Sequence, residues 1–110
     1  MTTGLKTTAE CLGFAKYTST DTAFHLTDAP AAGVTLPATD PSAQGNRPQF
    51  ALLQADAQNI RWRDDGTAPA AGTGMLLTAG DAPFPYDGNL SAIQFIATTS
   101  GAILSVSYYK

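Results

Sequence analysis

Charged residues, cysteine and histidine are all scarce in this chain of 110 residues. Charged side chains make up 14% of it, against about 25% in an average soluble domain. The only cysteine, Cys11, has no partner for an intrachain disulfide, and the only histidine is His25. Metal sites and nucleophilic sites usually combine several such residues, so we expect no enzymatic activity, no cofactor and no bound metal.

Positive charge and long apolar runs are also missing. The formal net charge is −3, which removes the electrostatic basis for binding nucleic acid. No run of about 18 apolar residues is present, so we expect no membrane-spanning helix. No basic start followed by an apolar stretch is visible after Met1, and we therefore expect no secretory signal peptide.

Short segments with two-residue periodicity fill most of the chain. Apolar residues keep no helical spacing over ten or more positions free of Gly and Pro, whereas residues 102–109 alternate cleanly. Candidate strands are predicted at residues 11–19, 22–27, 34–36, 50–55, 59–65, 75–78, 84–86, 93–97 and 102–109.

This pattern predicts an all-β fold, a single-domain antiparallel β-sandwich or jelly-roll-like barrel of about eight short strands. The domain is expected to cover residues 11–110, with residues 1–10 as an N-terminal arm or tail. Residues 37–48 are predicted to be a long contact loop. The strands on either side of residues 56–59 are predicted to form a hairpin, and Pro85 is expected to confine its strand to a sheet edge.

The segment from Asn59 to Asp65 is the most informative in the chain. Ile60 and Trp62 alternate with Arg61 and Arg63, which is typical of a strand with one apolar and one charged face. The two arginines could bind an anion, but the acidic pair that follows them would largely neutralise the patch. We therefore favour Arg61 and Arg63 as salt-bridging contacts to a partner protein.

The aromatic residues allow two interpretations. Trp62 with Tyr86, Tyr108 and Tyr109 could form a sugar-stacking platform, but Trp62 shares a strand face with Ile60 and is better explained by core packing. Tyr109 falls on the opposite face from the core positions of its strand. Tyr86 and Tyr109 are therefore added to the candidate partner contacts.

Two polar clusters are candidate chemical sites. His25 with Cys11 and Asp21 has no metal-ligand spacing, so an exposed strand histidine is the better explanation. Asp64, Asp65 and Asp87 could hold calcium or form an acid–base pair. The spacing of a calcium-binding loop is absent, and Asp-Gly pairs are typical of turns.

The chain resembles a family of small virion proteins of tailed phages. The residues that carry the resemblance cover over half of the chain: Leu52-Leu53-Gln54-Ala55, the run from Asn59 to Pro69, Gly74-Met75, Ala79-Gly80, Tyr86-Asp87-Gly88, Leu90-Ser91-Ala92-Ile93, Phe95-Ile96 and Leu104-Ser105-Val106-Ser107-Tyr108-Tyr109. The segment from Pro37 to Pro48 has no counterpart in it.

The resemblance implies a virion component that is made in the host bacterial cytoplasm. Within that class we expect a capsid decoration, or cement, protein on the capsid surface. Its partners would be the major capsid protein, copies of itself, or both, as a dimer or trimer. A tail, neck or fibre-associated adaptor and a host-glycan binding module using Tyr86, Tyr109 or Arg61 remain alternatives, and a hydrolase is the weakest.

Overall fold

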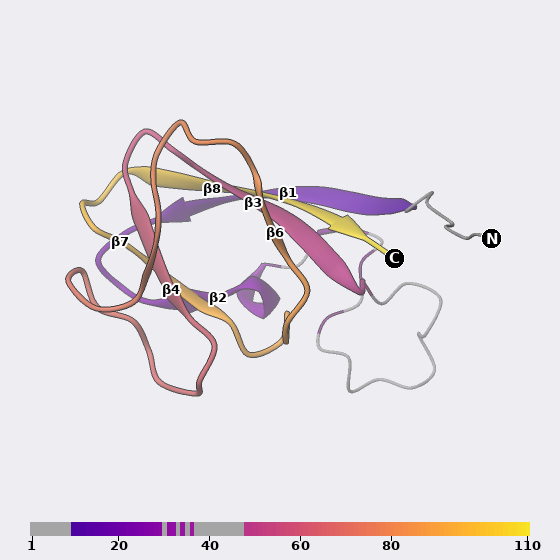
Figure 1. The fold of residues 1–110 in the computed structure, drawn as a ribbon, viewed down its shortest axis with the longest axis horizontal. Coiled ribbons are helices and arrows are strands. Elements are labelled where there is room, and N and C mark those ends of the chain that lie inside the picture. Colours follow the sequence, from indigo (N-terminus) through magenta and orange to yellow (C-terminus); the bar gives the residue numbers. More distant parts are fainter. Residues whose placement is uncertain (1–9, 30, 33, 35, 37–47) are drawn as a thin grey trace.

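Two antiparallel sheets of four strands each make up the part of the chain that the structure describes (Figure 1). The computed structural model describes residues 10–29, 31, 32, 34, 36 and 48–110. No helix in this described part is long and apolar enough to cross a membrane. The strands are β1 (Cys11–Ser19), β2 (Phe24–His25), β3 (Phe50–Asp56), β4 (Ile60–Arg63), β5 (Met75–Leu77), β6 (Phe84–Tyr86), β7 (Gln94–Ala97) and β8 (Ala102–Tyr109), and a short 3-10 turn, η1 (Leu26–Asp28), follows β2.

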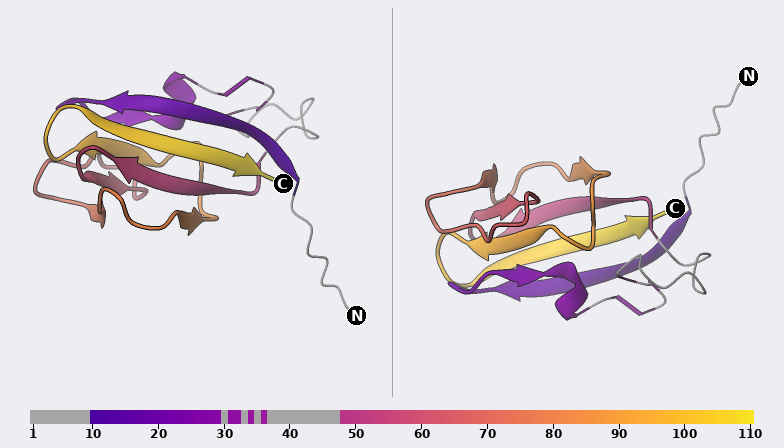
Figure 2. Two further views of the ribbon diagram at one scale, coloured as in Figure 1. Left: turned by 90° about the horizontal axis from the view of Figure 1, so that it is seen from above. Right: turned by 90° about the horizontal axis from the view of Figure 1, so that it is seen from below.

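The strand order is that of a jelly roll. One sheet has the order β1-β8-β3-β6 and the other β2-β7-β4-β5. The pairs β1–β8, β2–β7, β3–β6 and β4–β5 are all hydrogen-bonded, so the chain folds as one long two-stranded ribbon that wraps into two layers. In both views of Figure 2, β8 lies between β1 and β3, and the ribbon's start and end lie at one end of the molecule. The predicted all-β sandwich is confirmed.

The core lies between the sheets and follows the predicted alternation. All four inward residues of β8, namely Ala102, Leu104, Val106 and Tyr108, are fully buried. Ile60 and Phe95 of the opposite sheet are also fully buried. Strong alternation along β8 suits a strand that has one face on the core and one outside.

A buried pair of tyrosines ties η1 to this core. Tyr17 donates a hydrogen bond from its hydroxyl to the carbonyl oxygen of Leu26 at 3.1 Å. The hydroxyls of Tyr17 and Tyr108 lie 2.7 Å apart. Because the one proton of Tyr17 goes to Leu26, Tyr108 is the donor within the pair.

Three sequence predictions need correction. The strands β3 and β4 do not form a hairpin: β3 pairs with β6 and β8, whereas β4 belongs to the other sheet. Ala57 between them takes a positive φ of 69°, and the chain crosses from one sheet to the other there. The strand predicted at residues 22–27 is reduced to the two residues of β2, and the described positions Val34 and Leu36 lie in no strand.

One further prediction concerns the strand that contains Pro85, and two concern the segments at residues 1–10 and 37–48. Pro85 does lie on an edge strand, as expected, because β6 ends its sheet. Residues 1–9 of the expected arm and residues 37–47 of the expected contact loop lie outside the described residues.

Candidate functional site

Arg61 is engaged within its own chain. It projects from β4, and its guanidinium donates from Nε to the carbonyl oxygen of Ala71 at 3.0 Å and from Nη1 to that of Gly74 at 2.8 Å. These bonds fasten the connection between β4 and β5, residues 64–74, to the strand. Arg61 thus has a structural role that the sequence interpretation did not include.

Arg63 also has an internal partner. Its guanidinium holds the Asp65 carboxylate with two contacts, one of them from Nε to Oδ1 at 3.1 Å. This hydrogen bond is the main cause that lowers the pKa of Asp65 and raises that of Arg63. The backbone N–H of Thr67 donates to the same carboxylate at 3.3 Å. The acidic pair that follows the arginines thus neutralises one of them, as the sequence predicted.

Tyr86 is buried rather than exposed, so its ring has little surface to offer a partner. Its hydroxyl donates to Oδ2 of Asp64 at 2.7 Å, and its ring meets Trp62 edge-on at 5.5 Å between centroids. Burial is the largest cause that raises the pKa of Tyr86, and the hydrogen bond to Asp64 is the second largest. Asp64 therefore joins the end of β4 to β6 across the two sheets.

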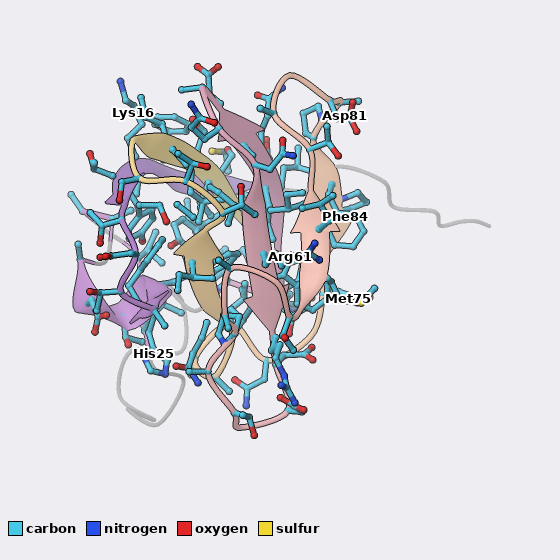
Figure 3. All side chains as sticks on the ribbon, turned by 90° about the vertical axis from the view of Figure 1, so that its left-hand side faces the viewer. Lys16, His25, Arg61, Met75, Asp81 and Phe84 are labelled. Atoms are coloured by element: carbon cyan, nitrogen blue, oxygen red, sulfur yellow. The ribbon has the colours of Figure 1, made fainter. Side chains whose placement is uncertain are left out.

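The sandwich is open along the edge formed by β5 and β6. Met75 and Phe84 lie in register with inward-facing residues, since Met75 opposes Trp62 and Phe84 opposes Leu53. Met75 is nevertheless 60% exposed and Phe84 39% exposed. Figure 3 shows both on the same side of the molecule, away from Lys16 and His25. The ring of Phe84 lies 6.0 Å from that of Trp62, so an aromatic cluster reaches the surface here.

A hollow of about 450 Å³ adjoins this cluster, and we call it the Trp62 hollow. It is lined by Trp62, Arg63, Asp64 and Asp65 at the end of β4 and by Thr73, Gly74 and Met75 at the start of β5. Trp62 is half-buried and packs against the core, which agrees with core packing, and it also lines this surface hollow.

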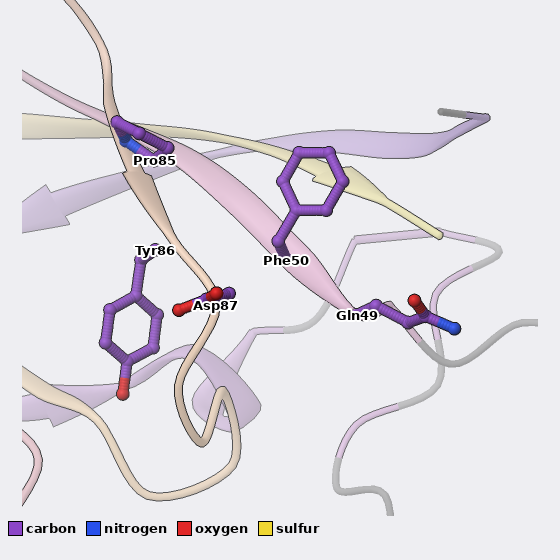
Figure 4. A pocket seen from close by; sticks show the side chains of 5 residues that line it. All are labelled: Gln49, Phe50, Pro85, Tyr86 and Asp87. Atoms are coloured by element: carbon purple, nitrogen blue, oxygen red, sulfur yellow. The ribbon is translucent and has the colours of Figure 1, made fainter. Parts of the chain in front are cut away.

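A second hollow, of about 520 Å³, lies near the other end of β6. Gln49, Phe50, Pro85, Tyr86 and Asp87 line it, and the ring of Tyr86 points away from Phe50 (Figure 4). Asp87 is the only charged residue among the residues that line it, whereas Arg63, Asp64 and Asp65 all line the Trp62 hollow.

The side of the β1-β8-β3-β6 sheet that faces away from the core combines apolar and polar side chains, and we call it the outer face. Its outward positions follow from the strand register: Phe14, Lys16 and Thr18 on β1, Ile103, Ser105, Ser107 and Tyr109 on β8, Phe50, Leu52, Gln54 and Asp56 on β3, and Pro85 on β6. Only Lys16 and Asp56 among these are charged. The outward faces of solvated sheets are normally polar, whereas half of these positions are aromatic, aliphatic or proline.

Tyr109 lies on the outer face, as predicted, and stacks on Phe50 with ring centroids 5.0 Å apart. Phe14 on the same face is 58% exposed. Phe14 on β1, Ser107 on β8, Leu52 on β3 and Pro85 on β6 are paired in succession and form one row across the sheet. The outer face thus joins aromatic, aliphatic and hydroxyl side chains along this row.

The two candidate chemical clusters do not gather enough side chains to hold a metal ion in the described part of the chain. The described residues contain no group of three or more His, Cys, Asp and Glu side chains that could hold a metal ion. The backbone N–H of His25 donates to Oδ2 of Asp28 at 2.9 Å, and the thiol of Cys11 lies 3.7 Å from the hydroxyl of Ser107.

Comparison of the chain with protein-family models, with curated proteins and with solved structures gives no match.

Of the four predicted contact residues, Arg63 and Tyr86 lie beside Trp62, Tyr109 lies on the outer face, and Arg61 secures a loop. Sequence reasoning missed Thr73 and Met75 as members of the Trp62 hollow. They line the hollow because β5 pairs with β4, and no local pattern in the sequence predicts that pairing.

Proposed function

We propose that this protein is a non-enzymatic structural component of a phage virion, a capsid decoration protein that binds the major capsid lattice through its outer face. The observation that carries the proposal is the composition of that face, where Phe14, Leu52 and Tyr109 lie among hydroxyl groups and the row that contains Phe14 and Leu52 holds no charge. A contiguous uncharged surface with aromatic residues is the kind of surface that protein interfaces use.

The jelly-roll fold supports this proposal only in part, because the fold serves capsid proteins and lectins alike. A decoration protein needs no catalytic group. It needs a surface that gains free energy on binding, and many copies then stabilise the bound form of the shell by mass action. Symmetric lattices also favour closed oligomers of the decorating chain, such as the dimer or trimer expected from sequence.

The decisive measurement is the number and position of copies in purified particles. Decoration predicts a copy number comparable to that of the major capsid protein and density on the outside of the head. A few copies at the neck, the tail or a fibre would contradict decoration and favour the adaptor alternative.

A binding assay tests the outer face itself. Leu52→Arg places a charge between Ser107 and Pro85 in the middle of the face, where its desolvation opposes binding. We expect the affinity of the purified chain for undecorated capsids to fall at least about tenfold, which corresponds to about 1.4 kcal/mol.

Thr67→Arg is the matched control, because Thr67 is exposed in the connection between β4 and β5 and lies on the other sheet's side. It should bind capsids like the unmodified chain. Equal binding by the two variants, with both shown to be folded by their denaturation curves, would contradict the assignment of the outer face.

A further inference from the structure

We propose that the Trp62 hollow is a binding subsite for a sugar ring. The hollow joins an aromatic ring, a thioether and a fixed set of polar groups at an open end of the sandwich. Its volume of about 450 Å³ falls within the range of about 300–1,000 Å³ found for small-ligand sites.

The apolar wall comes from the β4–β5 pair. Trp62 and Met75 are directly opposite each other in the register, so their side chains share one face. Tyr86 and Phe84 pack against Trp62 and hold its position. A sugar ring has C–H faces that pack on an aromatic side chain, while its hydroxyls need polar partners around the rim.

The polar wall offers donors and acceptors side by side. The Arg63 guanidinium and the Asp65 carboxylate form a two-point pair, and the Thr67 N–H further fixes that carboxylate. Asp64 is fixed by the Tyr86 hydroxyl. Adjacent hydroxyls of a sugar can donate to a carboxylate and accept from a neighbouring guanidinium, and the groups here are already ordered before any ligand arrives.

The charge of the hollow argues against an anionic ligand. Arg63 is paired with Asp65, and Asp64 adds a further negative charge, so phosphate or a carboxylate would be repelled. A cationic amine is the competing ligand, because carboxylates and an aromatic ring also attract amines. The hydroxyl of Thr73 and the ordered donor–acceptor pair favour the neutral, hydroxyl-rich ligand over the amine.

The sugar site does not depend on the proposed capsid function. The Trp62 hollow belongs to the β4–β5 end of one sheet, whereas the outer face belongs to the other sheet. Leu52→Arg should therefore leave sugar binding unchanged, and changes in the hollow should leave capsid attachment unchanged.

The chain contains a single tryptophan, so its fluorescence reports on this hollow alone. The purified full-length chain is titrated with methyl glycosides of glucose, galactose, mannose, rhamnose and N-acetylglucosamine, and is applied to an array of bacterial surface glycans. We expect at least one sugar to give a saturable change in Trp62 fluorescence.

Three variants locate the binding. Thr73→Val removes one rim hydroxyl and Asp64→Asn removes a charge while leaving an oxygen acceptor for Tyr86; each should weaken sugar binding about tenfold. Thr18→Val, on the outer face, makes the same chemical change as Thr73→Val outside the hollow and should leave affinity unchanged.

The outcomes separate clearly. No saturable response to any glycoside together with no array signal overturns the proposal, and so does sugar binding that Thr73→Val and Asp64→Asn leave intact. A response to methylammonium that falls with added salt and is lost in Asp64→Asn, without a response to sugars, assigns the hollow to amines and overturns it as well.

Discussion

Gly88 lies so close to the buried ring of Tyr86 that no side chain fits between them. A Cβ at this position would be 2.4 Å from the Tyr86 hydroxyl and 2.6 Å from Cζ. The ring cannot move away cheaply, because it is buried and its hydroxyl is bonded to Asp64. We expect Gly88→Ala to lower the free energy of unfolding by about 1–3 kcal/mol, measured by urea denaturation.

Gly72→Ala provides the matched control for this prediction. A Cβ at Gly72 would meet nothing within 4 Å. The control should therefore stay within about 0.5 kcal/mol of the unmodified chain. Equal stability of the two variants would show that the Tyr86 ring relaxes without cost.

The two buried tyrosines are not equivalent, although their hydroxyls share one hydrogen bond. In Tyr17→Phe the buried Tyr108 hydroxyl loses its acceptor, and the Leu26 carbonyl keeps only the Ala29 N–H at 3.4 Å. In Tyr108→Phe the Tyr17 hydroxyl still donates to Leu26. Since an unmade buried hydrogen bond costs about 1–3 kcal/mol, Tyr17→Phe should be the more destabilising change by about 1 kcal/mol in thermal or urea unfolding. The reverse order would contradict the donor assignment.

Three tyrosines should also make the fold sensitive to alkali. Burial is the largest cause that raises the pKa values of Tyr17, Tyr86 and Tyr108 above the ordinary tyrosine value of about 10. Below about pH 10 the hydroxyls are protonated in both states, whereas above it the unfolded chain releases protons that the folded chain retains. The free energy of unfolding should therefore fall as pH rises beyond about 10, measured from urea midpoints, and fall less steeply in Tyr108→Phe. A midpoint that stays constant through this range would contradict the prediction.

At the scale of elements, the connection between β4 and β5 depends on Arg61. Two separate donors of its guanidinium reach Ala71 and Gly74, and an isolated bridge between Ala70 and Thr73 closes the loop beyond them. A lysine ammonium cannot reproduce this fork, so Arg61→Lys should destabilise the chain by about 1 kcal/mol. The amides of Ala70 and Thr73 should also exchange faster with deuterium.

Arg63→Lys is the control for the loop, because Arg63 contacts Asp65 on the surface rather than the carbonyls of the loop. It should leave exchange at Ala70 and Thr73 unchanged. Similar exchange in both variants would mean that the backbone bridge holds the loop without Arg61.

Strand positions were largely predictable from the sequence, and strand partners were not. The alternation along β8 and the effect of Pro85 are local properties, so they appear directly in the residue order. The connection at residues 57–59 has the length of a hairpin turn, but Ala57 sends β4 into the other sheet. A short connector permits either route, and only packing of both sheets decides between them. Ile96 is another case, because alternation predicts an outward residue, whereas it is only 7% exposed opposite Arg61.

At the scale of the whole molecule, the candidate site depends on the same long-range pairings. Trp62, Arg63 and the acidic pair could be found in the sequence because they are consecutive. Met75 and Thr73 join them through the β4–β5 register, and Tyr86 reaches Asp64 from a different sheet. Beyond the residues of β4, the sequence suggested Tyr86 as a neighbour of Trp62 but gave no sign of Thr73 and Met75, because these arrive through tertiary contacts.

The outer face leads to a last prediction, about self-association. Its row of Phe14, Ser107, Leu52 and Pro85 is uncharged, and a closed dimer or trimer would remove such a surface from water. We expect sedimentation analysis of the purified chain to show concentration-dependent dimers or trimers, Leu52→Arg to remain monomeric, and Thr67→Arg to associate like the unmodified chain. If the unmodified chain is monomeric at every concentration while Leu52→Arg still loses capsid binding, the outer face contacts the capsid lattice alone. Association that Leu52→Arg leaves unchanged would instead place the contact between copies on another surface of the jelly roll.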